Sequence, residues 1–325
     1  MKYTVVGDPH LKHKNINEMQ VVCARVEKLG NKTVWTGDLL DTKEIVRGKC
    51  LNFWYDYFDN SPLEHIVLVG NHDWFNLECE DHSLRILENL ANVVVVDNLV
   101  KPVATGEPYH LPYVHDIEKL RAMLAEIPDN EVVFGHFEIK DFDFGSGKIC
   151  ETGLTFEDFA RFKKVFSGHF HKFQERGNLI YVGTPFSHSF GETDQEKNIF
   201  IYDFAEDSYE KVDLGLPKHV TGEINCDESG ELMFPNTPNV DLAQDHIRVL
   251  LKGSRESINK FDRSPWRDFD IKWREVPTDE VVVGAQLNDM HDNTTQFANF
   301  AKDIKGWDKE TTKLGAQILE AVNVG

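Results

Sequence analysis

The chain has 325 residues, of which 41% are hydrophobic and 28% are charged, enough to bury one sizeable core and a smaller module. Its formal net charge of -20 argues against an enzyme that grips DNA by itself, because phosphates would be repelled at long range. No stretch approaches the ~18 apolar residues of a membrane-spanning helix, and the start enters a predicted strand without a signal peptide, so we expect a soluble cytoplasmic protein.

Continuous apolar runs predict strands that are covered on both faces, and amphipathic stretches between several of them predict helices. In chain order these are a strand at 3–6, a helix at 16–29, a strand at 33–35, a helix at 50–58, a strand at 65–69, helices at 83–90 and 117–127, and strands at 132–134 and 162–166. Two lysines interrupt the last run, which therefore fits least well. Alternating strands and helices predict a layered α/β domain.

A short polar segment follows each of the five strand candidates. Four of the segments open with a glycine and the other is preceded by one; a residue without Cβ lets the chain turn sharply and pass close to a bound ion. Ligand sites of layered α/β domains lie beyond the carboxyl ends of the strands, so we expect the segments to converge. They are Asp8-Pro9-His10, Gly37 to Asp41, Gly70 to Asp73, Gly135 to Phe137 and Gly168 to His171.

These segments supply seven candidate metal ligands, more than one tetrahedral ion uses but suited to two ions that share a carboxylate, for which Asp38 is the natural bridge. Imidazole and oxygen donors without a thiolate favour manganese, iron or zinc over magnesium or calcium. A water between two such ions would have its pKa lowered toward ~7 and become a hydroxide suited to attack on phosphorus. The seven are Asp8, His10, Asp38, Asn71, His136, His169 and His171.

Three more polar residues of the segments acquire possible roles. His72 follows a candidate ligand, so its ring could point past the metals to stabilise the transition state or protonate the leaving oxygen. Asp73 would orient that ring, or alternatively cap a turn. Asp41 is either an outer group of the metal site or a helix N-cap.

The ordered motifs D-x-H, G-D-x-x-D, G-N-H-D, G-H and G-H-x-H extend from residue 8 to residue 171 and resemble the pattern of the calcineurin-like metallophosphoesterase superfamily. Within it the chain resembles SbcD-type nuclease subunits, because Tyr181 to Pro185 and Ser189 to Glu192 are similar to their Y-x-G-[ST]-P and S-F-x-E stretches. The stretch from Gly135 to Leu154 also resembles bacteriophage recombination-nuclease subunits.

The resemblance implies a sandwich of two central β-sheets flanked by helices, and two metal ions, typically manganese, that serve exonuclease cleavage of duplex ends and endonuclease cleavage of single strands. His72, with Asp73, would be the catalytic group. Some relatives carry a histidine where Asp41 stands, which puts any transition-state role for that position in doubt. The implied ligands are Asp8, His10, Asp38 and His171 for one ion, and Asp38, Asn71, His136 and His169 for the other.

The sequence changes in character beyond the expected nuclease domain, residues 1–204. Short strand candidates separated by proline-containing loops predict a small α+β module at 205–284, which the resemblance makes a capping domain. Residues 285–325 have a helical pattern, and their apolar faces either pack on the chain's own core or dock into an SMC-like ATPase of the SbcC type. A homodimer is also possible.

The acidic charge leaves two interpretations: the substrate is small, or a partner supplies the grip on DNA. Basic clusters at 12–14, 161–164 and 172–176 flank the motifs and could contact phosphates, or could simply be solvated. The leading hypothesis is a manganese-dependent DNA nuclease subunit of a recombination or repair complex. The alternatives are a small-molecule or protein phosphoesterase and a scaffold for the ATPase without catalytic activity.

Residues outside the motifs carry weaker signals. The cysteines are odd in number and form no C-x-x-C pair, so we expect them to be reduced and structural. Among the remaining histidines only His188, beside the S-F-G-E stretch, is a candidate for a role at the site. The cysteines are Cys23, Cys50, Cys79, Cys150 and Cys226.

Overall fold

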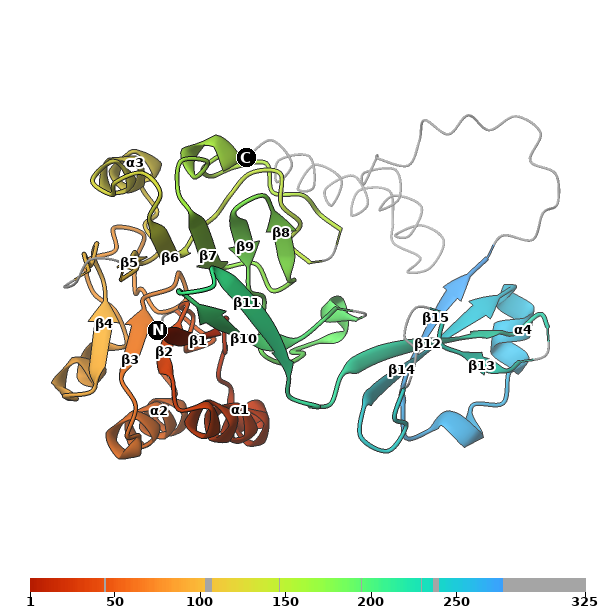
Figure 1. The fold of residues 1–325 in the computed structure, drawn as a ribbon. Coiled ribbons are helices and arrows are strands. Elements are labelled where there is room, and N and C mark those ends of the chain that lie inside the picture. Colours follow the sequence, from red (N-terminus) through yellow and green to blue (C-terminus); the bar gives the residue numbers. More distant parts are fainter. Residues whose placement is uncertain are drawn as a thin grey trace, which may run out of the picture. The chain divides into compact units, whose positions relative to one another are not determined.

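The first of three sheets has six strands, and the first three polar motifs of the chain follow three of these strands (Figure 1). In this computed structural model its central strands run parallel, and the two strands contributed by later residues run antiparallel to them. The order is β11 (Ser208–Asp213), β10 (Asn198–Asp203), β1 (Lys2–Val6), β2 (Lys32–Trp35), β3 (His65–Leu68) and β4 (Val93–Val96).

The structure describes residues 1–43, 45–102, 107–145, 147–193, 195–228, 230–235 and 240–276. One compact unit extends from Met1 to Glu275. The predicted helical region at 285–325, and with it the predicted ATPase-binding surface, lies outside the described residues. None of the helices that the structure describes is both long and apolar enough to cross a membrane.

The second sheet has five strands and packs face to face on the first. Its order is β5 (Tyr109–His110), β6 (Val132–His136), β7 (Lys164–Gly168), β9 (Leu179–Tyr181) and β8 (Gln174–Arg176). Between the sheets, Val5 and Val34 of the first lie in one buried cluster with Phe134 and Phe166 of the second, whose rings stack at 5.3 Å. The predicted two-sheet α/β sandwich is therefore confirmed.

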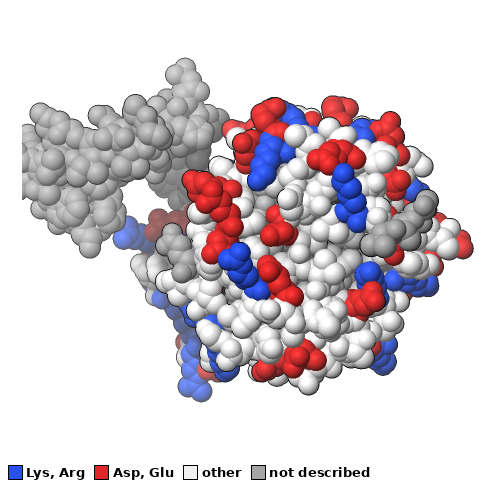
Figure 2. Space-filling model, turned by 90° about the vertical axis from the view of Figure 1, so that its left-hand side faces the viewer, with Lys and Arg blue, Asp and Glu red and all other residues white. Residues whose placement is uncertain are grey.

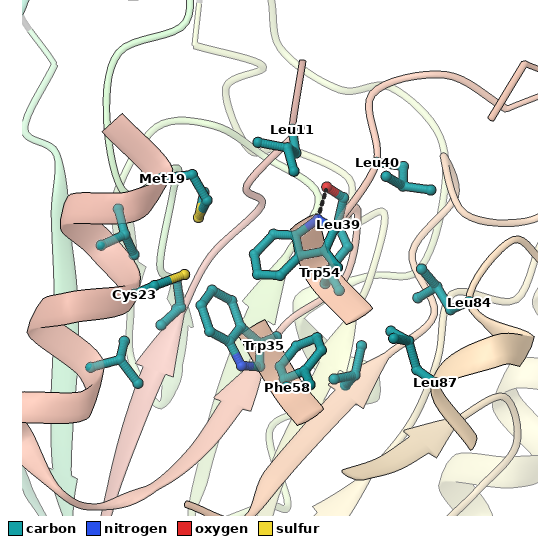
Figure 3. Packing of buried hydrophobic residues seen from close by; sticks show 14 of the residues in the cluster. Leu11, Met19, Cys23, Trp35, Leu39, Leu40, Trp54, Phe58, Leu84 and Leu87 are labelled. Atoms are coloured by element: carbon teal, nitrogen blue, oxygen red, sulfur yellow. Dashed lines mark hydrogen bonds between the residues drawn. The ribbon is translucent and has the colours of Figure 1, made fainter. Parts of the chain in front are cut away.

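Helices cover the outer faces of the sandwich. α1 (Ile16–Leu29) and α2 (Gly48–Asn60) lie on the first sheet, where Trp35 of β2 contacts Trp54 and Phe58 of α2 (Figure 3). The indole N–H of Trp54 also donates to the carbonyl of Leu39, 3.1 Å away. This bond fixes the loop that carries Asp38 to the core of the domain. On the second sheet, α3 (Ile117–Ala125) is capped by the carboxylate of Asp116.

Two predicted elements differ from the structure. The helix expected at 83–90 is only a short 3₁₀ helix, Arg85–Asn89, inside a longer turn region. The strand expected at 162–166 is displaced and forms β7 at Lys164–Gly168. Phe162 still belongs to the preceding turn, because its N–H donates to the carbonyl of Phe159.

The third sheet is a small module with the order β13 (Leu232–Met233), β12 (His219–Asn225), β14 (His246–Gly253) and β15 (Asp270–Glu275), and α4 (Arg255–Lys260) lies in the connection between β14 and β15. It has its own buried cluster, which includes Val220, Ile224 and Val249. The boundary placed at residue 204 is too early. It falls between β10 and β11, which are hydrogen-bonded neighbours, so the first sheet extends to Asp213.

Candidate metal centre

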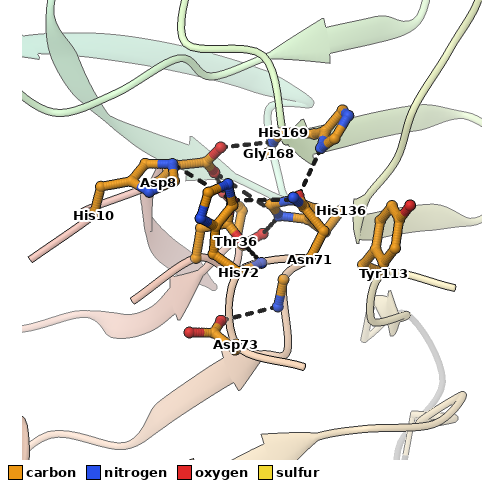
Figure 4. Close-up of polar contacts among 12 residues, drawn as sticks. Asp8, His10, Thr36, Asn71, His72, Asp73, Tyr113, His136, Gly168 and His169 are labelled. Atoms are coloured by element: carbon orange, nitrogen blue, oxygen red, sulfur yellow. Dashed lines mark hydrogen bonds and ion pairs between the residues drawn. The ribbon is translucent and has the colours of Figure 1, made fainter. Parts of the chain in front are cut away.

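The seven predicted ligands lie together at the carboxyl ends of strands in the two central sheets. Figure 4 shows Asp8, His10, Asn71, His136 and His169 among them. β1, β2 and β3 run parallel and deliver the first four, and β6 and β7 deliver the three later histidines. All but Asn71, His169 and His171 are buried. The arrangement confirms that the five polar segments converge, and it divides the seven side chains into two groups joined by Asp38.

The first group contains Asp8, His10 and His171, whose donor atoms lie within 4.8 Å of one another. The Nε2 atoms of the two histidines face each other at 3.0 Å. The Nδ1–H of His171 points the other way and donates to Glu192 at 2.9 Å. Donation from Nδ1 fixes the tautomer, so the lone pair on Nε2 of His171 is directed into the centre.

The second group contains Asn71, His136 and His169. The Nδ1–H of His136 donates to the carbonyl of Thr36 at 2.7 Å, and burial lowers the pKa of this ring to about 4, so its Nε2 carries a lone pair at neutral pH. That atom lies 2.9 Å from the Oδ1 atom of Asn71, which also lies 2.8 Å from Nδ1 of His169. Two acceptors face each other here, and a bound cation would satisfy both.

Asp38 stands between the two groups. Its Oδ2 atom lies 3.4 Å from Nε2 of His10 and 3.7 Å from Nε2 of His136. Its Oδ1 atom accepts the backbone N–H of His72 at 2.7 Å, which holds the carboxylate in this orientation. A single carboxylate placed this way can donate to an ion on either side.

The electrostatics of the centre favour bound cations. Burial, and then the neighbouring charge of Asp38, raises the pKa of Asp8 well above its usual range, so negative charge accumulates here at a cost. Burial, followed by the nearby His171, lowers the pKa of His10 well below its usual range. Neutral imidazoles cannot compensate the carboxylates, whereas divalent ions would stabilise both kinds of donor.

The backbone at the centre adopts conformations that side chains rarely take. His10, Asp38 and His169 have φ values of 40°, 52° and 91°, and all three are among the predicted ligands. Such backbone costs about 1–3 kcal/mol at each residue and is characteristic of functional sites, because the surrounding structure must hold it in place.

Two glycines of the motifs are required by close packing against the carboxylates. A Cβ atom at Gly70 would lie 2.2 Å from Oδ1 of Asp38, and one at Gly168 would lie 2.3 Å from Oδ1 of Asp8. From the sequence, these glycines were expected to let the chain pass near a bound ion. The structure shows that they make room for the carboxylates themselves.

His72 lies beside the first group, with its ring 4.7 Å from that of His10. Its Nδ1–H donates to the backbone carbonyl of Asp41 at 2.7 Å, so Nε2 is left free to act toward the centre. The predicted contact between Asp73 and this ring is wrong. The carboxylate of Asp73 is completely buried and accepts the backbone N–H groups of Leu39, Leu40 and Gly70.

Asp41 lies at the edge of the site and does not cap a helix, so the alternative prediction of a helix N-cap is wrong. α2 begins several residues later, with Arg47 at its N-cap position. The carboxylate of Asp41 pairs with Lys12 at 2.7 Å and lies 3.8 Å from Nδ1 of His10. Its carbonyl, not its carboxylate, orients His72.

Two carboxylates behind the histidines were given no role by sequence analysis. Glu192 accepts from His171 and pairs with the buried Lys197 at 2.8 Å. Burial alone would raise the pKa of Glu192, but the bond from His171 and the charge of Lys197 outweigh it and hold this pKa below its usual range. Glu138 lies 3.6 Å from Nε2 of His169, and its interaction with this ring lowers the pKa of Glu138 to about 2.

Both glutamates close short stretches of the sequence that carry the family resemblance, S-F-G-E and G-H-F-E. Their residue type and their position beside the histidine motifs were the only available signal. His188, also a candidate from the sequence, has a buried ring 5.8 Å from that of His10, and among the described residues neither of its ring nitrogens has a hydrogen-bond partner.

Most lysines and arginines of the predicted basic clusters are engaged by acidic side chains. Arg161 pairs with Asp129 at 2.7 Å, Lys172 with Asp143 at 2.9 Å, and Lys12 with Asp41. On the face that is leftmost in Figure 1, Lys and Arg are likewise scattered among Asp and Glu (Figure 2). These clusters therefore offer less positive charge to a phosphate backbone than their sequence suggests.

The chain is similar to known proteins in sequence and, more weakly, in structure. "Exonuclease subunit 1" of Enterobacteria phage T4 is 25% identical over 280 residues, which cover 81% of this chain and 80% of that protein. A solved structure of a hypothetical protein from Thermus thermophilus has a TM-score of 0.36 and 14% identity, over 57% of this chain and 77% of the other. The model of the calcineurin-like phosphoesterase family matches residues 1–173, more than half of the chain. The chain therefore belongs to the calcineurin-like phosphoesterase family, whose members use divalent metal ions.

Proposed function

We propose that this protein is a manganese-dependent DNA nuclease that hydrolyses phosphodiester bonds at a centre for two divalent ions. The observation that carries the two-ion centre is the position of Asp38, whose Oδ2 atom lies between His10 on one side and His136 on the other. The similarity to a protein named an exonuclease subunit supports DNA as the substrate.

In this proposal each ion has its own set of ligands and shares Asp38 with the other. The shell mixes imidazole, carboxylate and amide donors without a thiolate, which suits manganese. When bound, the ions supply a water whose pKa is lowered to ~7 and neutralise charge on the phosphate. The first set is Asp8, His10, Asp38 and His171, and the second is Asp38, Asn71, His136 and His169.

His72 is the proposed catalytic histidine. Because its Nδ1–H is committed to the carbonyl of Asp41, the ring presents Nε2 to the space beside His10. From there Nε2 can protonate the leaving oxygen or stabilise the transition state. Asp73 assists only indirectly, because it fixes the backbone around Gly70 and Leu39 on which the centre is built.

The acidic charge is consistent with a nuclease that does not hold its DNA alone. The related phage protein is named a subunit, so we propose that a partner, an SMC-like ATPase of the SbcC type, supplies the grip. The exposed acidic groups of this chain, whose formal net charge is -20 over its whole length, would then face away from the duplex.

The direct test uses end-labelled duplex DNA, manganese and the variant His72→Ala. We expect cleavage to fall by about 10²- to 10⁴-fold, the usual contribution of a general acid or base, while metal content measured by elemental analysis stays unchanged. The exposed His246 of β14, changed to Ala, is the matched control and should cleave normally. Wild-type cleavage by His72→Ala would refute the assigned mechanism, and absence of any DNA cleavage by the wild-type chain with its partner would refute the function.

A further inference from the structure

A cavity of about 330 Å³ adjoins the metal centre on the side of the second sheet. His136 forms part of its wall, so a group bound in the cavity would lie directly beside a proposed metal ligand. The other walls come from α3 and from the segments that precede α3 and follow β6. The lining residues include Tyr113, Ile117, Leu120, Glu138, Thr152 and Leu154.

An aromatic side chain stands at the boundary between the cavity and the centre. The ring of Tyr113 stacks on that of His169, with centroids 5.8 Å apart and an angle of 24° between the planes, and meets His136 edge-on at 6.0 Å (Figure 4). Leu120 and Leu154 are buried behind it. A flat, uncharged ring would therefore find an aromatic wall and an apolar floor.

The polar groups of the cavity select against phosphate. Its lining includes no lysine or arginine among the described residues, and it does include the carboxylate of Glu138. One oxygen of this carboxylate accepts from the hydroxyl of Thr152 at 2.6 Å. A carboxylate repels an anion and accepts N–H donors, so the charged part of a phosphoester would lie at the metal centre and a neutral part with N–H groups would lie in the cavity.

We propose that this cavity receives the nucleobase of an unpaired nucleotide next to the scissile phosphate. The inference rests on the proposed nuclease function, and it names how that site recognises its substrate. A base that is paired and stacked inside a duplex cannot enter a pocket, so the terminal nucleotide must leave the stack before cleavage. Base stacking on an aromatic side chain tolerates all sequences, which suits a nuclease acting on DNA ends.

The test compares wild-type cleavage of two labelled duplexes with the ATPase partner present. One duplex carries an unpaired adenine nucleotide at its end, and the other carries a tetrahydrofuran abasic residue at the same position. Each duplex is made in two forms, one with this residue at the 3′ end and one with it at the 5′ end. At the end where cleavage begins, we expect the abasic duplex to be cleaved about 5- to 150-fold more slowly, the range given by base–aromatic stacking. Equal rates at both ends would overturn the inference while leaving the nuclease function intact, whereas cleavage of neither duplex would refute that function.

The variant Ile117→Trp fills the cavity from α3. It should reduce cleavage of the adenine duplex to the abasic rate and leave cleavage of the abasic duplex unchanged, which also shows that the variant is folded. Ile86→Trp is the matched control, because Ile86 is exposed on the 3₁₀ helix Arg85–Asn89 and does not line the cavity. A filled cavity with an undiminished preference for adenine would contradict the assignment of the base to this pocket.

Discussion

The two sides of the metal centre are built alike but exposed differently. On one side His171 donates to Glu192 at 2.9 Å, and on the other His169 faces Glu138 at 3.6 Å. The side chain of Glu192 is 8% exposed and that of Glu138 is 31% exposed. One histidine is therefore held by a buried carboxylate, and the other by a carboxylate that borders an open cavity.

The buried side needs an additional charge to remain stable. Lys197 pairs with Glu192 at 2.8 Å and also donates to the carbonyl of His171 and to the hydroxyl of Thr184. Burial lowers the pKa of this lysine, yet its partners compensate much of the desolvation. The two sides therefore differ in the carboxylate behind the histidine and not in the exposure of the histidine itself: Glu192 is fixed in the core and Glu138 borders the cavity, while the side chain of His171 is 33% exposed and that of His169 is 12% exposed.

Asp38→Asn removes the element that the two sides share, so it should have the largest effect. With one shared carboxylate gone, we expect metal to be lost from both groups and hydrolysis to fall on the order of 10³-fold or more, since bound ions supply several kcal/mol of charge stabilisation. Elemental analysis and cleavage of a phosphodiester measure the two losses. A variant that keeps both ions would show that the sides are independent.

Glu192→Gln tests the buried side alone. Loss of the carboxylate behind His171 should weaken metal binding by about 10- to 100-fold, as titration with manganese would measure. The unpaired Lys197 should also destabilise the fold by about 3–5 kcal/mol in chemical unfolding.

The double variant Glu192→Gln with Lys197→Met separates these two effects. It removes both buried charges, so stability should largely return while metal affinity remains low. If metal affinity returned together with stability, Glu192 would serve the fold and would not position His171.

Glu138→Gln makes the same change on the open side and should cost less. Its contact to His169 is longer and partly solvated. We therefore expect metal affinity to fall by less than ~10-fold, the lower limit of the usual loss when a group that orients a metal ligand is removed. Manganese titration of this variant beside Glu192→Gln provides the matched pair. An equal or larger loss for Glu138→Gln would reverse the ranking of the two sides.

The sequence predicted the convergence of the polar segments better than it predicted the groups that hold their side chains. Continuous apolar strands and the polar segments after them located all seven ligand candidates, because parallel strands must end at one edge of a sheet. The partners of His72 and His171 could not be found this way. Asp41 acts through a backbone carbonyl that carries no residue signature, and Glu192 and Lys197 meet only after the chain has folded.

The fold showed a similar limit at its boundaries. Nothing in the composition after Phe204 marks β11 as part of the first sheet, because it is an edge strand whose residues are mostly exposed and of which only Val212 is buried. The helix expected at 83–90 was replaced by a 3₁₀ turn, which buries Leu87 with a shorter segment. Local patterns therefore identified the central strands, while edge elements depended on tertiary pairing.

His188→Leu should have the smallest effect, and it concerns the stability of the metal-free protein. His188 lies on the buried side, where its backbone N–H donates to Glu192, and burial lowers the pKa of its ring from 6.5 to about 3. Below pH 6.5 the unfolded chain therefore binds a proton that the folded chain does not, so stability falls as the pH falls toward 3. The contribution is about 1.4 kcal/mol for each pH unit in this interval.

Removing this histidine should therefore flatten the acid side of the stability profile. Between pH 7 and pH 5.5, urea unfolding of chelator-treated protein should show a loss smaller by about 1.4 kcal/mol in His188→Leu than in the wild type. The exposed His13, changed to Leu, is the control and should keep the wild-type profile. Identical profiles for all three proteins would show that the buried side opens to water when its metal is removed, and the contrast between the two sides would then depend on the bound ions.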